Sequence, residues 1–370
     1  MARLVAAFGT SHSTMLMSSE EHWIDMFDHV DRRAPIHDFE GVERSFDWLL
    51  DHPPAGAPDL IAPGAIAARH GAAMAALDRL EADIAGAGLD ALIIVGDDQR
   101  EIFTDDSRPA IAVHYGETIR NAAAPAGMPD DWYGRDQLRR LEDGADVHYP
   151  VRSDLALHLV HGLTLGGFDI AAVKDLSADR YEGHAFSFVH RRLMRNGPIP
   201  IVPVFLNTYY PPNQPTPRRC FDLGDSLRAL VESFPADLGV GIMASGGLSH
   251  FLVNEKLDRM IVRALRDGDL SPVVSLPLAQ LQSGTSEVRN WICAAAAARN
   301  LALDWIEYVP AYRSRALTGV GLCFAHWKQA GMPRADGAGN PRRGRLRPRF
   351  SPAAGARLPA APPSRGGRRG

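Results

Sequence analysis

The stretch "ALIIVGDDQREIF", residues 91–103, decides the fold class of this chain. Its first five residues form a short apolar run with β-branched side chains, which predicts a buried β-strand over 91–95. The run passes directly into a polar turn that holds three carboxylates and one amide. The stretch therefore predicts a strand whose carboxyl end carries reactive side chains.

The same alternation of short apolar runs and longer amphipathic stretches recurs on both sides of this segment. Further strands are expected at 3–8, 198–206, 238–244, 303–309 and 318–324. Helices are expected at 65–86, 152–162, 222–234, 254–267 and 286–300. This rhythm is typical of α/β proteins, so we expect a single domain with a mostly parallel central sheet flanked by helices.

Composition narrows the class of protein further. The chain has 370 residues, 45% of them hydrophobic, which is enough for a sizeable core. Its apolar runs are shorter than the ~20 residues that cross a bilayer, and the first residues lack a signal-peptide pattern, so we expect a cytoplasmic protein without membrane spans. Three scattered cysteines, Cys220, Cys293 and Cys323, are expected to be buried apolar residues rather than disulfide or metal ligands.

The chain divides into an expected catalytic domain, 1–328, and a tail, 329–370. Residues 331–370 hold ten Arg and one Asp, a net charge of +9, which leaves −13 on the rest of the chain. The tail is rich in Pro, Gly and Ala, so we expect it to be disordered. Arginine blocks can bind nucleic acid, but few aromatic residues accompany them, which favours a dispensable extension and no nucleic-acid partner.

Four polar segments each follow a predicted strand. They are "GTSHS" (9–13), "GDDQREIF" (96–103), "NTYYPPNQP" (207–215) and "SGGLSHF" (245–251). Because the carboxyl ends of parallel strands share one edge of a sheet, we expect these loops to form one crevice at that edge. The segments "YEGHAFSFVH" (181–190) and "SGTSEVRNW" (283–291) are candidates to join them.

Three histidines and one glutamate in these turns are candidate site residues. Taken alone, each of His12, His184 and His250 is better explained as an ordinary loop histidine. Glu287 can likewise be explained by its favourable interaction with a helix dipole. Together they match a metal site with acid–base helpers. A serine-hydrolase elbow is disfavoured because Phe251 stands two residues after Ser249, where that motif requires glycine.

The motifs resemble a known family. "FGTSHSTML", "VGDDQREIF", "EGHAFSFV", "NTYYPPNQPTPRRCFDLGDSL", "ASGGLSHF" and "SEVRNWI" occur in the order seen in class III extradiol ring-cleavage dioxygenases of the protocatechuate 4,5-dioxygenase β-subunit type. The resemblance is strongest to the single-chain branch that includes 3-O-methylgallate dioxygenase. It implies a non-haem Fe(II) held by His12 and Glu287, with His250 as catalytic base and His184 in substrate binding and proton transfer.

One motif departs from the family pattern. The second histidine ligand of the family usually lies in a motif resembling "NDH", and here that motif reads Asp97-Asp98-Gln99. Gln99 can ligate the metal through its amide oxygen, a neighbour such as Asp98 or Glu101 can replace it, or iron is no longer tightly bound. The methylgallate-like branch also tends to read "DDQ", which favours a working variant.

The expected reaction is opening of the ring of a catechol or gallate-type aromatic acid beside its hydroxyls, with incorporation of O2. An Fe(II) centre with imidazole and carboxylate ligands suits that chemistry, and a nearby imidazole can accept a phenolic proton. Tyr209 and Arg218 are candidates to meet the substrate's ring or carboxylate, although an ordinary turn explains them equally well. A homodimer is expected, and a separate small subunit stays open.

Two other functions stay open at this stage. The missing histidine at position 99 motivates a second hypothesis, a non-catalytic binding or interaction protein on the same fold. A zinc hydrolase that uses the same ligands is a weaker alternative.

Overall fold

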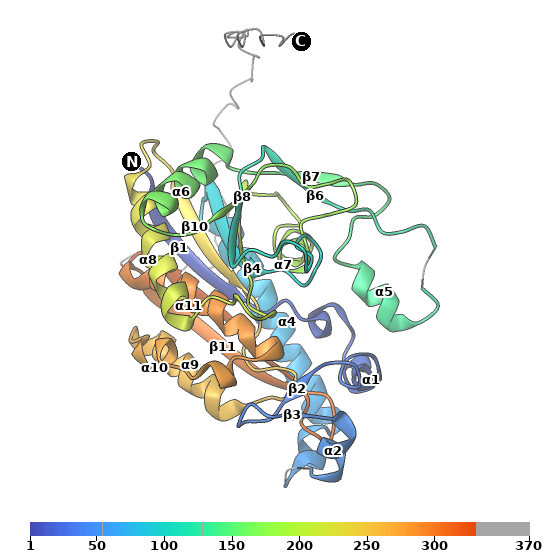
Figure 1. Ribbon diagram of the computed structural model, residues 1–370. Helices are drawn as coiled ribbons and strands as arrows, with labels where there is room; N and C mark the ends of the chain where they lie inside the picture. The colour runs from blue at the N-terminus through green and yellow to red at the C-terminus, as the bar shows by residue number, and fades with distance from the viewer. Residues whose placement is uncertain (54, 128, 331–370) are drawn as a thin grey trace, which may run out of the picture. The chain divides into compact units, whose positions relative to one another are not determined.

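The computed structural model describes residues 1–53, 55–127 and 129–330. An eight-stranded sheet lies at the centre, in the order β11-β12-β1-β10-β4-β9-β5-β8 (Figure 1). The strands are β1 (Arg3–Thr10), β4 (Ala91–Asp97), β5 (Ile111–His114), β8 (Ala171–Val173), β9 (Ile201–Leu206), β10 (Gly239–Ser245), β11 (Ala302–Tyr312) and β12 (Gly319–Lys328). Strands β1, β10, β4 and β9 run parallel to one another, whereas β12 pairs antiparallel with β1 and β11. The predicted α/β class with a mostly parallel sheet is confirmed.

All six predicted strands are present, and the sequence analysis missed two short ones, β5 and β8. Strand β5 pairs antiparallel with β9 and parallel with β8 at the far edge of the sheet. Two small antiparallel sheets of two strands each lie outside the main sheet, β2 (Ile36–His37) with β3 (Glu43–Arg44) and β6 (Thr118–Asn121) with β7 (Val147–Pro150). Strands this short have too few residues for a clear alternating pattern.

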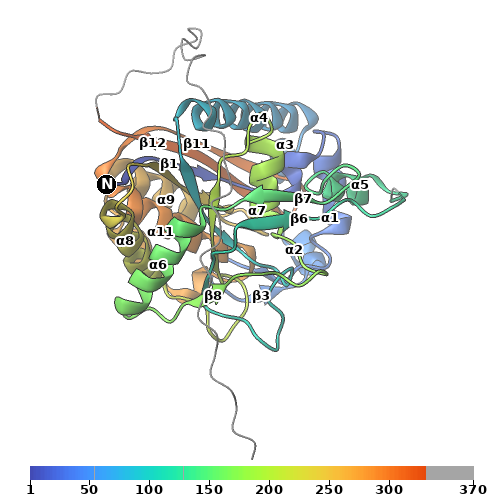
Figure 2. The same cartoon turned by 90° about the horizontal axis from the view of Figure 1, so that it is seen from above.

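Helices cover both faces of the sheet (Figure 2). Helices α6, α8, α9 and α11 pack on one face, and α4 and α7 pack on the other. The helices are α1 (His22–His29), α2 (Phe46–Asp51), α3 (Ala57–Leu60), α4 (Pro63–Gly86), α5 (Trp132–Leu138), α6 (Ser153–Leu165), α7 (His184–Phe188), α8 (Pro217–Ser233), α9 (Glu255–Asp267), α10 (Ser271–Val274) and α11 (Val288–Ala297).

Helix α8 begins five residues before its predicted start at 222. The side chain of Thr216 caps it by accepting the Arg219 N–H at 3.1 Å, and Pro217 occupies the first helical position. Both features favour a helix start because a cap satisfies a free N–H and proline has none to lose.

Close packing of α8 against α11 fixes the position of the α11 N-terminus. Gly224 on α8 faces the backbone of Cys293, and a Cβ at residue 224 would lie 2.0 Å from the Cys293 carbonyl oxygen. Trp291 on α11 donates its indole N–H to the Gly246 carbonyl at 2.8 Å. These contacts place the first residues of α11 beside the loop that follows β10.

The described residues belong to one compact unit. Apart from its first two residues, the predicted tail 329–370 lies outside the part of the chain that the structure describes. Cys220, Cys293 and Cys323 are free and buried, as predicted. Among the described residues, no helix is both long enough and apolar enough to cross a bilayer.

Candidate active site

The predicted crevice lies at the carboxyl edge of the parallel strands. Thr10, the last residue of β1, pairs with Ser245, the last residue of β10, and β4 continues two residues beyond Val95, which pairs with Ala244. His12 and His250 lie in the loops after β1 and β10, and the "DDQ" motif begins at Asp97, the last residue of β4. The convergence expected from parallel strands is therefore observed.

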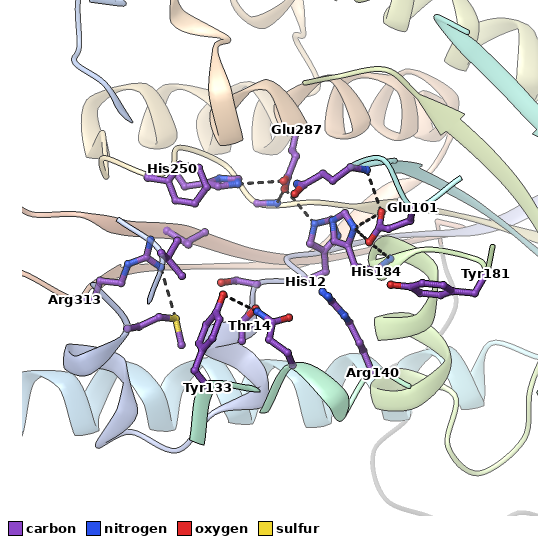
Figure 3. A pocket seen from close by; sticks show the side chains of 18 residues that line it. His12, Thr14, Glu101, Tyr133, Arg140, Tyr181, His184, His250, Glu287 and Arg313 are labelled. Carbon is purple, nitrogen blue, oxygen red and sulfur yellow. Dashed lines mark hydrogen bonds and ion pairs between the residues drawn. The ribbon is translucent and has the colours of Figure 1, made fainter. Parts of the chain in front are cut away.

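A cavity of about 470 Å³ opens between these loops, helix α5 and the first residue of α7 (Figure 3). It is lined by His12, Ser13, Thr14, Met26, Val30, Gln99, Glu101, Tyr133, Gln137, Arg140, Tyr181, His184, Gly247, His250, Phe251, Glu287, Arg313 and Val320. A volume of this size is in the range of small-molecule sites. Apolar side chains and ionisable groups thus face the same space.

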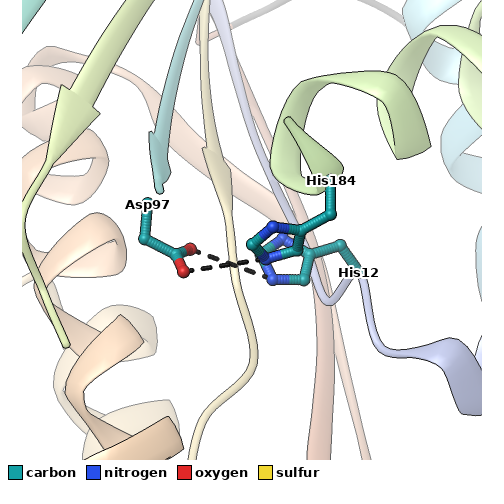
Figure 4. Close-up of side chains that lie close together, drawn as sticks. All are labelled: His12, Asp97 and His184. Atoms are coloured by element: carbon teal, nitrogen blue, oxygen red, sulfur yellow. Dashed lines mark ion pairs between the residues drawn. The ribbon is translucent and has the colours of Figure 1, made fainter. Parts of the chain in front are cut away.

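Two histidines and an aspartate meet at the edge of this cavity (Figure 4). One ligand atom from each of His12, Asp97 and His184 lies within 4.8 Å of the other two. The Asp97 carboxylate lies 3.9 Å from His12 Nε2 and 3.7 Å from His184 Nε2, and all three side chains are at most 9% exposed. Such a buried group of nitrogen and oxygen donors suits a divalent transition metal.

Glu287 adds a second carboxylate to the cluster. Its Oε2 lies 3.4 Å from His12 Nε2 and accepts the Gly247 N–H at 2.6 Å, while Oε1 lies 3.1 Å from His250 Nε2. Burial opposes the charge of Glu287, but His250 and His12 outweigh it and hold the pKa of Glu287 well below its usual range. Its side chain therefore turns into the site instead of only complementing the dipole of α11.

Hydrogen bonds fix the ring orientation of His12. Ser245 donates its hydroxyl proton to the Ala185 carbonyl at 2.7 Å, so Ser245 Oγ accepts from His12 Nδ1 at 3.0 Å. With Nδ1 as the donor, His12 Nε2 faces the cluster as the nitrogen available to a ligand. A partner of this kind typically orients a metal-binding histidine.

His184 is held in a similar way by Glu101. Both carboxylate oxygens lie within 3.0 Å of His184 Nδ1, and Glu101 also accepts the backbone N–H of His184. Burial opposes the imidazolium, but the charge of Glu101 and its hydrogen bond outweigh burial and raise the pKa of His184 to about 9. Its Nε2 is buried and has no hydrogen-bond partner among the described residues.

His250 bridges Glu287 and the strand-end loop. Its Nδ1 donates to the Leu248 carbonyl at 3.0 Å, and its Nε2 lies 3.1 Å from Glu287 Oε1. Burial lowers the pKa of His250, but attraction to Glu287 outweighs it, so that the pKa lies above its ordinary value. Gly284 leaves room for the ring, because a Cβ at residue 284 would lie 1.9 Å from His250 Cδ2.

The "DDQ" turn places its three side chains differently. Asp98 stabilises the turn by accepting the N–H groups of Arg100, Ile102 and Phe103 at 2.8–3.1 Å. Gln99 lines the cavity, and its amide nitrogen donates to Asp97 Oδ2 at 3.3 Å. Of this motif, Asp97 is the residue that faces His12 and His184.

The two predicted substrate contacts lie elsewhere. Neither Tyr209 nor Arg218 lines the cavity. The Tyr209 hydroxyl lies 3.2 Å from Ser283 Oγ, and Arg218 is an exposed residue of α8 paired with Asp222 at 2.9 Å. The structure brings together His12, His184, His250, Glu287 and Gln99, and leaves these two outside.

Sequence reasoning missed Asp97 as a member of the cluster, and it missed Arg140 altogether. A signal for Asp97 was present, because it continues the row of Ala91, Ile93 and Val95 on β4, which packs in the same core as α11. Arg140 follows α5 in a stretch with no clear periodicity, and we find no sequence signal for it.

Residues 135–311 match the family described as the catalytic LigB subunit of aromatic ring-opening dioxygenase. A gallate dioxygenase of Pseudomonas putida is 35% identical over 105 residues, which cover 28% of this chain and 29% of the relative. The chain therefore matches less than a third of that relative's length. These similarities agree with the resemblance that the motifs indicated.

Proposed function

We propose that this chain, which contains a domain of the LigB family of aromatic ring-opening dioxygenases, is a non-haem Fe(II)-dependent extradiol dioxygenase acting on a catechol or gallate-type aromatic acid. The observation that carries the proposal is the cluster of His12, Asp97, His184 and Glu287 beside a cavity large enough for one aromatic ring. The substrates would be a small aromatic acid and O2.

The donor set fits ferrous iron. His12 presents Nε2, and Asp97 and Glu287 present carboxylate oxygens, while the buried His184 Nε2 lies beside them without a partner within the described residues. Imidazole and carboxylate ligands suit Fe(II), and the buried cysteines lie outside the cavity. We assign His12, Asp97 and Glu287 as the residues that would hold the metal, with Asp97 in place of the histidine that position 99 lacks.

Bound Fe(II) would supply a centre at which a catechol and O2 meet and exchange electrons. The chain itself provides proton transfer. His250 Nε2 lies at the cavity wall and is the group we assign to accept a phenolic proton and return it to the ring-opened product. Its Nδ1 stays bound to the Leu248 carbonyl, which keeps the ring oriented during that exchange.

His184 has the second proton-transfer role. Glu101 holds Nδ1, so Nε2 faces the same space as His12, where it can donate a hydrogen bond to a substrate oxygen. Met26, Val30, Phe251 and Val320 supply apolar surface against which a flat ring can pack.

The proposal is tested by loading the protein with Fe(II) anaerobically and measuring oxygen uptake with 3-O-methylgallate, gallate and protocatechuate. We expect one iron per chain in the wild type and stoichiometric uptake with at least one substrate. Asp97→Asn should lose iron, whereas His184→Gln should retain iron and lose turnover. Iron-loaded wild type that consumes no oxygen with any of the three would contradict the proposal.

The second candidate is a non-catalytic binding protein on the same fold, which the glutamine at position 99 favours. The variant Gln99→His separates the two functions. Oxygen uptake by the wild-type protein supports a working iron site. Oxygen uptake by the histidine variant alone would mean that the wild-type protein has lost catalysis and that binding is its present role.

A further inference from the structure

The cavity carries one arginine whose charge is not neutralised by a close partner. Two arginines line it, Arg140 and Arg313. Arg313 is 1% exposed and is held by Asp31, which accepts from its Nε at 3.0 Å and its Nη2 at 2.5 Å. By contrast, the Arg140 guanidinium forms no ion pair or hydrogen bond with any residue in the described part of the chain.

The backbone at Arg140 is nevertheless held in place. The buried amide of Asn121 donates to the Arg140 carbonyl at 2.9 Å and to Glu142 Oε1 at 2.9 Å. Figure 3 shows the Arg140 side chain pointing from the end of α5 toward His12 and His184. An anchored backbone with a guanidinium that has no close partner is the arrangement expected of a group reserved for a ligand.

A cationic group of this kind suits an anionic ligand. Glu101 and Glu287 also line the cavity, but Glu101 is paired with His184 and Glu287 with His250, whereas the Arg140 guanidinium has no close partner among the described residues. Arg140 interacts electrostatically with Glu101, Tyr181 and His184, so its charge reaches into this space. A guanidinium offers two parallel N–H donors that match the two oxygens of a carboxylate.

We propose that Arg140, assisted by the hydroxyl of Tyr181, binds the carboxylate of the aromatic substrate and makes the site selective for aromatic acids over neutral catechols. This inference rests on the proposed function. Tyr181 lines the cavity on the side of Arg140, and no hydrogen bond of its hydroxyl to a described residue is present. Figure 3 separates both residues from His250, which lies beyond the His12–Glu287 cluster.

The separation of Arg140 from His250 indicates where the substrate's carboxylate lies relative to its hydroxyls. A ring whose hydroxyls face His250 and the metal-binding cluster would direct a carboxylate on its opposite side toward Arg140. Aromatic acids with the carboxylate meta or para to the hydroxyls, as in gallate and protocatechuate, fit this arrangement. Arg140 takes over the role that the sequence analysis gave to Arg218.

The test compares ligand pairs that differ only in the carboxylate, gallate with pyrogallol and protocatechuate with catechol. Dissociation constants are measured by calorimetry on Fe(II)-loaded protein without oxygen, so that no turnover is needed. In Arg140→Gln we expect about 10- to 100-fold weaker binding of the two acids and less than about threefold change for the neutral partners. Arg140→Lys, which keeps the charge, should recover part of the loss.

The control is the neighbouring Arg139→Gln, because Arg139 lies outside the cavity and binds Met17 O and Asp136 instead. It should leave all four constants within about twofold of wild type. Equal weakening of acids and neutral catechols in Arg140→Gln, or no change for the acids, would overturn the inference. Binding of the acids without ring opening would overturn the proposed function alone, whereas ring opening without any preference for the acids would overturn this inference alone.

Discussion

Replacement of Glu101 by glutamine tests how the site holds His184. Glu101 and His184 form a pair with side chains 13% and 9% exposed, and Glu101 Oε1 lies 2.8 Å from His184 Nδ1. Glutamine keeps a hydrogen-bond acceptor of the same length but removes the charge. The variant Glu101→Gln therefore isolates the electrostatic part of the interaction.

The size of the effect follows from the pKa of His184. It rises from 6.5 to about 9 in the folded protein, because the attraction and hydrogen bond of Glu101 outweigh the cost of burial. A shift of that size corresponds to about 3 kcal/mol of folding stability. Since the folded pKa is raised, this stabilisation is fully present below 6.5 and is lost as pH rises through about 9.

The pKa of Glu101 sets the lower end of the pH range in which the Glu101–His184 pair stabilises the folded protein. Burial opposes its charge, but His184 and a hydrogen bond from it outweigh burial and lower the pKa of Glu101 from 4.5 to about 2. Its contribution is present above 4.5 and is lost as pH falls through about 2. The pair is therefore most stabilising between these two ranges, around pH 4.5 to 6.5.

The assay is urea unfolding of metal-free protein, followed by tryptophan fluorescence. At about pH 6 we expect Glu101→Gln to lower the free energy of unfolding by about 3 kcal/mol, and by much less at about pH 10. The exposed Glu117 provides the control, and Glu117→Gln should change stability by less than about 0.5 kcal/mol at either pH. An equal loss for Glu101→Gln at both pH values would refute the reasoning.

Three further predictions concern the metal and its surroundings. Ser245→Ala removes the partner of His12 Nδ1 and should weaken Fe(II) binding by about 10- to 100-fold, measured by competition with a chelator; unchanged affinity would contradict the assigned orientation. Gly284→Ala would place a Cβ 1.9 Å from His250 Cδ2, so we expect bound iron to persist while turnover falls at least about 100-fold; full activity would remove His250 from the proton-transfer role. Chelation of wild-type protein should abolish oxygen uptake, and Fe(II) but not Zn(II) should restore it; restoration of oxygen uptake by zinc, which has no redox chemistry, would contradict the assignment of iron.

The fold was predictable because its main strands are long and apolar. Strand β4 is buried at every position, and its run of five apolar residues is the pattern that a parallel strand covered on both faces requires. Loops after such strands must meet at one edge, which is why His12, His250 and the "DDQ" turn could be grouped from sequence alone. The assignment of Glu287 to the site could be made only through the family resemblance. Taken alone, an acidic residue at the start of a helix is explained by its favourable interaction with the helix dipole.

The remaining features depend on geometry that the sequence pattern does not encode. Whether Asp97, Asp98 or Gln99 faces the cluster depends on the last two residues of β4 and on a turn that Asp98 itself stabilises. The position of Arg140 depends on Asn121, which is nineteen residues away along the chain. Contacts of that kind have no periodic signature, so side-chain direction had to come from the structure.

The most direct test of the central claim uses labelled oxygen. Iron-loaded wild type is given gallate or protocatechuate under 18O2, and the ring-opened product is analysed by mass spectrometry. The proposed dioxygenase chemistry predicts that both labelled atoms appear in one product molecule and that Asp97→Asn yields none. A gallate product with one labelled atom, or oxygen consumption with release of labelled peroxide and an intact ring, would contradict the account, whereas a protocatechuate product can lose one label because an aldehyde oxygen exchanges with water.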